Sequence, residues 1–388
     1  MSKRILPIIV FSQFACTSLW FAGNAIINNL ITEFNLPNAA LANLTSAIQF
    51  GFIIGTLVFA LLSIADRFSP SKVFFFCAIA GAMLNLVTIW SGNSFTSLIA
   101  SRFFTGFFLA GIYPVGMKIA ADYFEKGLGK SLGFLVGALV LGTAFPHLLK
   151  AFLADLPYRS VIFLSSGLAV FGGILMLLLV PNGPFRKPSL KIDFSVILSV
   201  FKNKSFRDAA FGYFGHMWEL YAFWTFVPVM LSAFAENNPT LKIDIPLLSF
   251  LIIGLGGISC VVAGYISERL GVKRTAFYAL LFSCICCLVS PLFFLVNAQF
   301  ILISFLVFWG WVVIADSPLF STLIAQNASA ATKGTALTIV NSIGFLITIF
   351  SIQFIYFISE FITPTFSYIF LAIGPILGLI ALKSQKNK

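Results

Sequence analysis

The chain has 388 residues, of which 59% are hydrophobic and 10% are charged, and its mean hydropathy is +1.01. Soluble domains average about 45–50% apolar and about 25% charged residues, so this composition excludes a water-soluble globular protein. A net charge of +11 would indicate nucleic-acid binding in a soluble protein. In a membrane protein the distribution of the bases matters more, and we expect no nucleic-acid partner.

Twelve apolar stretches are long enough, or nearly so, to cross a hydrocarbon core of about 30 Å as helices. In chain order they cover residues 5–30, 40–64, 73–91, 96–120, 131–151, 160–180, 208–232, 246–266, 275–296, 299–322, 335–358 and 362–382. The sequence therefore predicts an all-α integral membrane protein with twelve transmembrane helices.

A short polar phrase occurs twice, each time between two apolar stretches. Residues 65–72 read Ala-Asp-Arg-Phe-Ser-Pro-Ser-Lys, and residues 267–274 read Ser-Glu-Arg-Leu-Gly-Val-Lys-Arg. An acid next to a base is costly beside hydrocarbon, so both phrases belong in loops. The repeat predicts two similar six-helix halves related by a pseudo-two-fold axis, an arrangement typical of secondary transporters. The predicted divisions are residues 1–180, a linker at 181–207, and residues 208–388.

The positions of Lys and Arg predict the orientation of the chain. If the N-terminus is cytoplasmic, the outer loops contain only the bases Lys150, Arg159 and Lys242. The positive-inside rule then places both termini and the linker in the cytoplasm, as in a bacterial inner-membrane protein. Within the linker, apolar residues at 192–201 recur at helical spacing. They indicate either an amphipathic helix on the membrane surface or an ordinary solvated linker helix.

Several motifs resemble those of the major facilitator superfamily of secondary transporters. The family's loop between helices 2 and 3 reads Gly-x-x-x-Asp-Arg-x-Gly-x-(Arg/Lys)-(Arg/Lys), which residues 264–274 match with Glu in place of Asp. In the first copy, Leu62 and Ser69 occupy the two glycine positions. Residues 102–114 are similar to the family's helix-4 pattern, and its Gly and Pro recur at 310 and 318. The resemblance covers nearly the whole chain and does not identify a subfamily.

The resemblance implies that the loop motif acts as a gate latch, in which glycines allow close helix approach. The alternative is that the bases are only topology signals, which leaves the acids unexplained. The second copy, with both glycines, is expected to form the better latch. The implied gating residues are Asp66, Arg67, Lys72, Gly264, Glu268, Arg269, Gly271, Lys273 and Arg274.

Ionisable residues inside predicted helices are expensive and therefore point to function. The resemblance implies that helices 1, 2, 4, 5, 7, 8, 10 and 11 line a central cavity. The five ionisable residues all fall on these helices, and they are Arg102, His147, His216, Glu219 and Asp316. The candidate cavity residues are Asn24, Gln49, Arg102, His147, His216, Trp218, Glu219, Tyr221, Trp224, Asp316 and Asn341.

His216 and Glu219 are three residues apart, so the sequence predicts them side by side on one helix face. Glu219 is then the favoured proton carrier, the alternative being a buried pair that fixes its helix against a neighbour. Asp316 precedes Pro318 and is a second proton site, a counter-charge to Arg102, or a hinge element. Arg102 stays charged and needs either one of these carboxylates or a substrate anion.

These observations predict a secondary active transporter that moves a small organic solute by alternating access, coupled to protons and functional as a monomer. The alternative is a facilitated or drug-type efflux carrier without the antiporter motif. An intramembrane enzyme is disfavoured because the two histidines form no His-Glu-x-x-His motif and no nucleotide loop occurs. A receptor or scaffold would be expected to have long soluble extensions. No cofactor or metal is expected, and the six cysteines are interpreted as packing residues.

Overall fold

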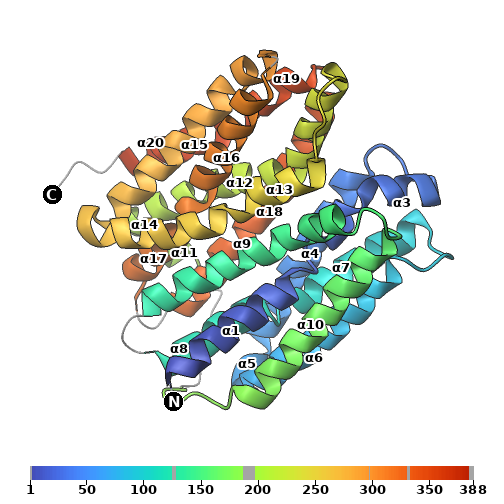
Figure 1. Cartoon of the computed structure of the whole chain (residues 1–388). Coiled ribbons are helices and arrows are strands. Elements are labelled where there is room, and N and C mark those ends of the chain that lie inside the picture. The colour runs from blue at the N-terminus through green and yellow to red at the C-terminus, as the bar shows by residue number, and fades with distance from the viewer. Residues whose placement is uncertain (1, 125–127, 187–196, 297, 330–332, 384–388) are drawn as a thin grey trace. The chain divides into compact units, whose positions relative to one another are not determined.

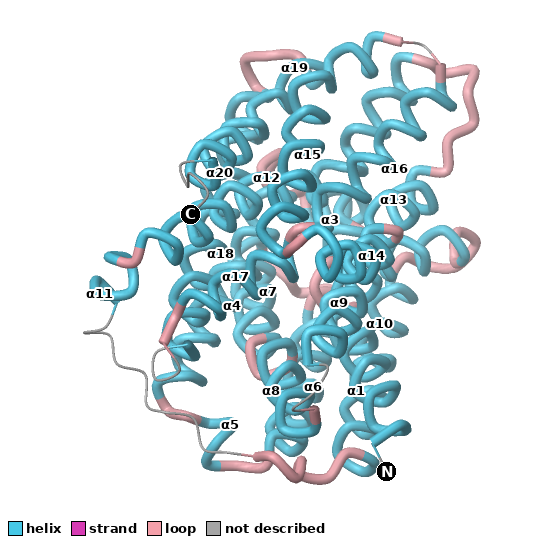
Figure 2. The backbone as a smooth tube through the Cα atoms, turned by 90° about the vertical axis from the view of Figure 1, so that its left-hand side faces the viewer, coloured by secondary structure: helices cyan, strands magenta, loops and turns pink. Residues whose placement is uncertain are grey.

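The computed structural model describes residues 2–124, 128–186, 197–296, 298–329 and 333–383. Figure 1 shows these residues as helices and their connections, and Figure 2 shows no strand in the same ranges. The predicted all-α class is therefore confirmed. Contacts divide the chain into two compact units, Met1–Lys191 and Ile192–Lys388, which are described separately. Residues 187–196 of the predicted linker lie outside the described residues.

The N-terminal unit contains the helices of the first half. They are α1 (Ser2–Thr17), α2 (Ala22–Ala25), α3 (Ile27–Phe34), α4 (Ala40–Leu61), α5 (Ile64–Arg67), α6 (Pro70–Val87), α7 (Phe95–Leu109), α8 (Tyr113–Tyr123), α9 (Leu128–Phe152) and α10 (Arg159–Leu179).

The C-terminal unit contains the remaining helices. They are α11 (Ile197–Lys202), α12 (Lys204–Asn237), α13 (Ile245–Gly254), α14 (Gly256–Leu270), α15 (Val272–Leu295), α16 (Gln299–Ala315), α17 (Ser317–Asn327), α18 (Lys333–Ser359), α19 (Pro364–Ser367), the 3-10 helix η2 (Tyr368–Ala372) and α20 (Ile373–Lys383).

Eleven helical segments in the described residues are long and apolar enough to cross a membrane, and the shorter apolar helix Arg4–Thr17 precedes them. This agrees approximately with the twelve predicted helices. The first predicted helix, 5–30, differs because the structure divides it into α1, α2 and α3. The helix predicted at 208–232 is longer than expected, since α12 extends from Lys204 to Asn237.

Polar side chains fix the starts of three helices. Ser94 begins α7 with a capping box formed with Ser97, while Asn203 and Asp244 accept backbone N–H groups at the starts of α12 and α13. Each cap satisfies donors that have no partner inside the helix. The caps therefore set where these helices enter the apolar region.

The two halves share the same interruptions. The segment α7–α8 is broken just before Pro114, and α16–α17 is broken just before Pro318, with each proline in the first turn of the second helix. Proline lacks a backbone donor and clashes with the preceding turn, which explains both breaks.

The halves also share a helix contact. A Cβ added to Gly106 would lie 2.0 Å from the carbonyl oxygen of Ile48 on α4, and one added to Gly310 would lie 2.0 Å from that of Ile252 on α13. Only glycine allows these backbones to approach so closely. The repeat in the sequence is therefore also a repeat in three dimensions.

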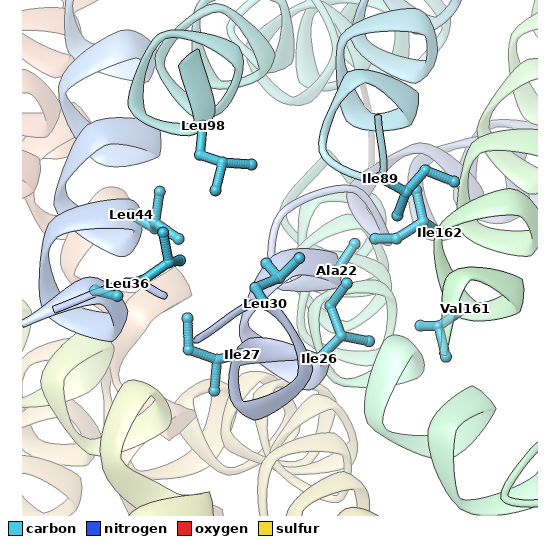
Figure 3. Packing of buried hydrophobic residues seen from close by; sticks show 11 residues of the cluster. Ala22, Ile26, Ile27, Leu30, Leu36, Leu44, Ile89, Leu98, Val161 and Ile162 are labelled. Carbon is cyan, nitrogen blue, oxygen red and sulfur yellow. The ribbon is translucent and has the colours of Figure 1, made fainter. Parts of the chain in front are cut away.

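An apolar cluster, shown in Figure 3, fills the end of the N-terminal unit that contains α2 and α3. Ile26, Ile27 and Leu30, from and just before α3, pack against the adjoining ends of α4, α6, α7 and α10. Burial of these side chains in one place anchors α2 and α3, which are too short to be stable alone.

Polar contacts hold α3 at the same end of the unit. Glu33 accepts hydrogen bonds from Tyr158 and Arg159, and Lys150 Nζ lies 3.1 Å from Asn29 Oδ1. The hydrogen bond from Tyr158 and the charge of Arg159 hold the pKa of Glu33 below its usual value. Two of the three bases predicted in outer loops, Lys150 and Arg159, thus bind α3, the last helix of the interrupted first segment.

Candidate functional site

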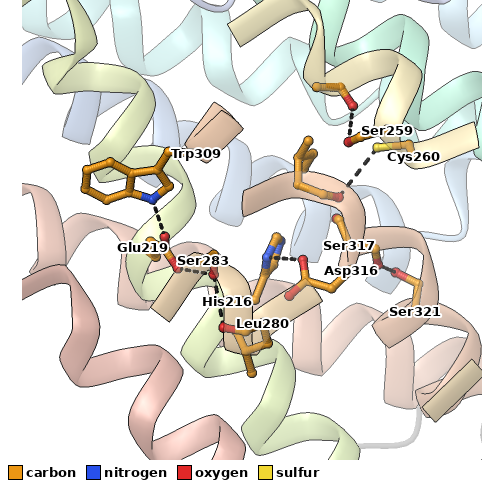
Figure 4. Close-up of polar contacts among 12 residues, drawn as sticks. His216, Glu219, Ser259, Cys260, Leu280, Ser283, Trp309, Asp316, Ser317 and Ser321 are labelled. Carbon is orange, nitrogen blue, oxygen red and sulfur yellow. Dashed lines mark hydrogen bonds and ion pairs between the residues drawn. The ribbon is translucent and has the colours of Figure 1, made fainter. Parts of the chain in front are cut away.

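Glu219 lies fully buried in the middle of α12 and faces α15 and α16. Its Oε1 accepts from Trp309 Nε1 at 2.6 Å and from Cys287 Sγ at 3.3 Å, and its Oε2 accepts from Ser283 Oγ at 2.8 Å. Figure 4 shows the contacts with Trp309 and Ser283. All three donors are neutral groups, so the carboxyl group is satisfied without a basic partner.

Local packing fixes these donors in place. The Trp309 ring lies against Phe223, one turn after Glu219 on α12, with centroids 4.6 Å apart, and also contacts Phe305 at 5.6 Å. This packing directs the indole N–H toward the carboxyl group. Ser283 and Cys287 are four residues apart on α15, so both side chains lie on the same face of that helix.

His216 pairs with Asp316 (Figure 4). Nδ1 of His216 on α12 lies 2.8 Å from Oδ1 of Asp316, which stands at the junction of α16 and α17, and both residues are buried. In the described residues, the other imidazole nitrogen and the other carboxylate oxygen have no hydrogen-bond partner. One imidazole nitrogen of His216 and one carboxylate oxygen of Asp316 therefore remain available for a further hydrogen bond.

His216 and Glu219 both lie on α12, three residues apart, but they have different partners. No hydrogen bond or ion pair joins them in the described part of the C-terminal unit, because His216 reaches the α16–α17 break whereas Glu219 reaches α15. Asp316 is consequently the partner of His216 in this unit.

The aromatic candidates on α12 separate into two groups. Trp218 donates to the carbonyl of Phe370 at 3.2 Å and packs against Phe354, so it points away from Glu219. The rings of Tyr221 and Trp224 are 5.2 Å apart, and both residues are buried. Trp218 therefore contacts η2 and α18, whereas Tyr221 and Trp224 contact each other.

Arg102 braces the interruption in the first segment of the N-terminal unit. Its Nη1 donates to the carbonyl of Leu19 at 3.2 Å and to Asn85 Oδ1 at 3.3 Å, and its Nη2 donates to the carbonyl of Trp20. Leu19 and Trp20 lie between α1 and α2, where the helical hydrogen bonds are broken. Unpaired carbonyls in an apolar environment cost several kcal/mol, so Arg102 makes this interruption possible.

The sequence predicts either a carboxylate or a substrate anion as the partner of Arg102, and the structure adds a third possibility, which is backbone carbonyls. Among residues 2–124 and 128–186, no carboxylate lies within ion-pair distance of Arg102, and its partners are two backbone carbonyls and an amide. Asn85, which also donates to Ser166 Oγ at 3.0 Å, is a site residue that the sequence interpretation missed.

The remaining candidates of the N-terminal unit lie near the same interruption or on α9. Asn24 on α2 donates to Thr45 Oγ1 on α4 at 2.8 Å. Gln49 lies one turn further along α4 and is fully buried, and neither of its amide atoms has a hydrogen-bond partner in the described residues. His147 on α9 is also buried, and its Nε2 has no hydrogen-bond partner there. Asn341, in the other unit, is partly buried on α18.

The first copy of the loop motif forms ion pairs with α8. Asp66 Oδ1 lies 2.9 Å from Lys118 Nζ, which is also 3.7 Å from Asp122 Oδ1. Arg67 and Lys72, the bases of the phrase itself, are exposed and form no ion pair in the described residues. The acid of the first copy thus pairs with a base on α8.

The segment after α10 binds across this motif. Arg186 Nη2 donates at 2.8 Å to the carbonyls of both Asp66 and Phe68, and Asn182 Oδ1 accepts from Ser69 Oγ at 2.8 Å. The hydroxyl of Tyr123, at the end of α8, donates to the carbonyl of Pro181 at 2.5 Å. The first residues of the predicted linker are therefore held to the N-terminal unit.

The second copy of the motif is less well connected. Glu268 is exposed and forms no ion pair with the described residues of its unit, and Arg269 and Arg274 are exposed as well. A Cβ on Gly264 would meet nothing within 4 Å, whereas Gly271 has φ +86° where α14 ends and α15 begins. Gly271 is thus required by backbone conformation, whereas no described residue of its own unit packs closely against Gly264.

A family model described as the Major Facilitator Superfamily matches residues 9–352. No relative with a curated description matches the chain. The family match spans both units and includes the interruptions, the glycine contacts and both copies of the loop motif. The chain therefore belongs to the major facilitator superfamily and is a multi-pass membrane transporter of small molecules.

Proposed function

We propose that this protein is a proton-coupled secondary active transporter that moves a small organic solute by alternating access, with Glu219 as the proton carrier. The observation that carries the proposal is the buried carboxyl group held by three neutral donors inside α12, α15 and α16. A buried ionised carboxylate without a basic partner is costly unless several hydrogen bonds compensate it.

Two protonation states are available to such a site. The three hydrogen bonds favour the ionised form, while the apolar surroundings favour the neutral form. A proton carrier needs this balance, because its affinity for the proton must change when the protein changes conformation. The second group that we propose takes part in proton transfer is the pair of His216, on the same helix as Glu219, and Asp316, at the junction of α16 and α17.

We further propose that the motif end of the N-terminal unit faces the cytoplasm, where the Asp66–Lys118 pair and the bound segment around Arg186 form the gate latch. Both termini then lie in the cytoplasm, as the positions of Lys and Arg favour. Arg102 supports the architecture of the first segment, so the charge of the solute does not have to complement it.

Proteoliposome transport tests the proposal. A panel of labelled metabolites in counterflow first identifies a solute, and the Glu219→Gln variant is then compared with the Glu236→Gln variant, whose residue is exposed at the end of the same helix. Glu219→Gln should exchange solute normally but fail to accumulate it in response to a pH gradient. Glu236→Gln should do both.

Two results would contradict the proposal. Accumulation by Glu219→Gln after a pH jump would assign the proton to another group, with Asp316 the next to test. Solute uptake by the unaltered protein that ignores the pH gradient would instead indicate a facilitated carrier.

A further inference from the structure

We propose that Ser283 is a hydrogen-bond switch that allows Glu219 to gain and lose a proton without moving, and that it thereby sets the pH at which the site titrates. The inference rests on the proposed role of Glu219 and adds a positioning residue on α15. This helix carries no charged residue in its interior, and Ser283 is not among the site residues predicted from the sequence.

Ser283 has two partners within reach of its hydroxyl group. Its Oγ lies 2.8 Å from Oε2 of Glu219 and 3.2 Å from the carbonyl oxygen of Leu280, one turn earlier on α15 (Figure 4). A hydroxyl group can donate one hydrogen bond and accept others, and its hydrogen rotates freely between acceptors. Ser283 can therefore act as a donor or as an acceptor toward the carboxyl group.

The other two partners fix which oxygen takes the proton. Trp309 Nε1 can only donate, and it and the Cys287 thiol both contact Oε1. Oε1 therefore stays an acceptor in both states. The proton must bind to Oε2, which faces Ser283.

The two states then differ only in hydrogen positions. When Glu219 is ionised, Ser283 donates to Oε2. When a proton binds to Oε2, the new O–H donates to Ser283 Oγ, and the serine hydrogen rotates to the Leu280 carbonyl. No heavy atom moves, and each polar atom keeps a partner, so neither state leaves a buried group unsatisfied.

Infrared difference spectroscopy of the purified full-length protein in lipid, titrated with protons alone, tests this switch. The Glu219→Gln variant identifies the carboxyl C=O band of Glu219 by removing it. In Ser283→Ala, the ionised form loses a charge-assisted hydrogen bond and the neutral form loses a weaker one. The titration midpoint of the band should therefore rise by about half to one pH unit. The band should also move to higher frequency, because its O–H has lost an acceptor.

Two further variants serve as controls. Ser283→Thr keeps the hydroxyl group and should restore the midpoint. Ser290 is a buried serine on the same helix. Its hydroxyl group donates to the carbonyl of Cys287 at 2.8 Å and has no hydrogen bond to Glu219 in the described residues. The Glu219 band of Ser290→Ala should therefore titrate at the midpoint of the unaltered protein. If Ser283→Ala does not fold, Ser283→Cys replaces it and should shift the midpoint less and in the same direction, since a thiol is a weaker partner.

The outcomes separate the two proposals. A Glu219 band that titrates in Ser283→Ala at the original midpoint and frequency overturns the switch and leaves the proposed function standing. An equal shift in Ser290→Ala also overturns it, because the effect would then be a general one of the helix. If no band that titrates is lost in Glu219→Gln, both proposals fail.

Discussion

Replacement of Arg102 by Met tests whether this residue is a brace or a receptor for the solute. Met fills a similar space but cannot donate, so the carbonyls of Leu19 and Trp20 and the amide oxygen of Asn85 all lose a partner. Each buried acceptor left without a partner costs about 1–3 kcal/mol, and a few kcal/mol return because the buried charge is gone. We expect a net loss of about 2–4 kcal/mol in the free energy of unfolding.

This loss is measurable without any solute. At about 2–4 °C per kcal/mol for a unit of this size, the unfolding midpoint in detergent should fall by about 5–15 °C. Arg102→Lys should lose less, since an ammonium group can still reach one or two acceptors. Arg67→Met, at an exposed position with no ion pair in the described residues, is the control and should unfold like the unaltered protein. An Arg102→Met variant that is as stable as the unaltered protein but fails to bind solute would refute the brace and support a receptor role.

Two further predictions follow from the paired features of the halves. Gly310→Ala should destabilise the C-terminal unit by at least about 1–3 kcal/mol, because its Cβ would meet the Ile252 carbonyl at 2.0 Å, whereas Gly264→Ala should be neutral or slightly stabilising in an unobstructed helix. Thermal unfolding of both variants checks this, and equal midpoints would contradict the tight contact. Asp66→Asn should slow transport more than Glu268→Gln, since Asp66 pairs with Lys118 whereas Glu268 has no ion pair with the described residues of its unit. Initial transport rates of the two variants test this prediction. A lower rate in Glu268→Gln than in Asp66→Asn would show that the second copy is the working latch.

Much of the fold could be predicted because the signals are local. Apolar length indicated the membrane helices, and the prolines at 114 and 318 lie at the breaks they would be expected to cause. The first segment could not be predicted in the same way. No proline explains its interruption at 18–21, which depends on a guanidinium group more than 80 residues further along the chain.

The candidate site was less predictable for a related reason. Burial of Glu219 was foreseeable, but two of its three partners are a serine and a cysteine on α15, and such residues usually indicate only packing. Their spacing of four residues, at 283 and 287, was the one available signal. Lys118 was also missed, because a single base near the end of a predicted helix resembles an ordinary topology signal.

The glycine contacts of the two halves have a consequence for how such a protein can diversify. In both halves the contact is made between a glycine and a backbone carbonyl, at Gly106 with Ile48 and at Gly310 with Ile252. Backbone atoms are the same whatever the neighbouring side chains are, so this framework survives substitution almost everywhere else. After a duplication, one copy could therefore acquire a buried cation and the other buried acids while the helices kept their spacing. New transport chemistry can then arise by changing side chains alone, without a search for a new fold.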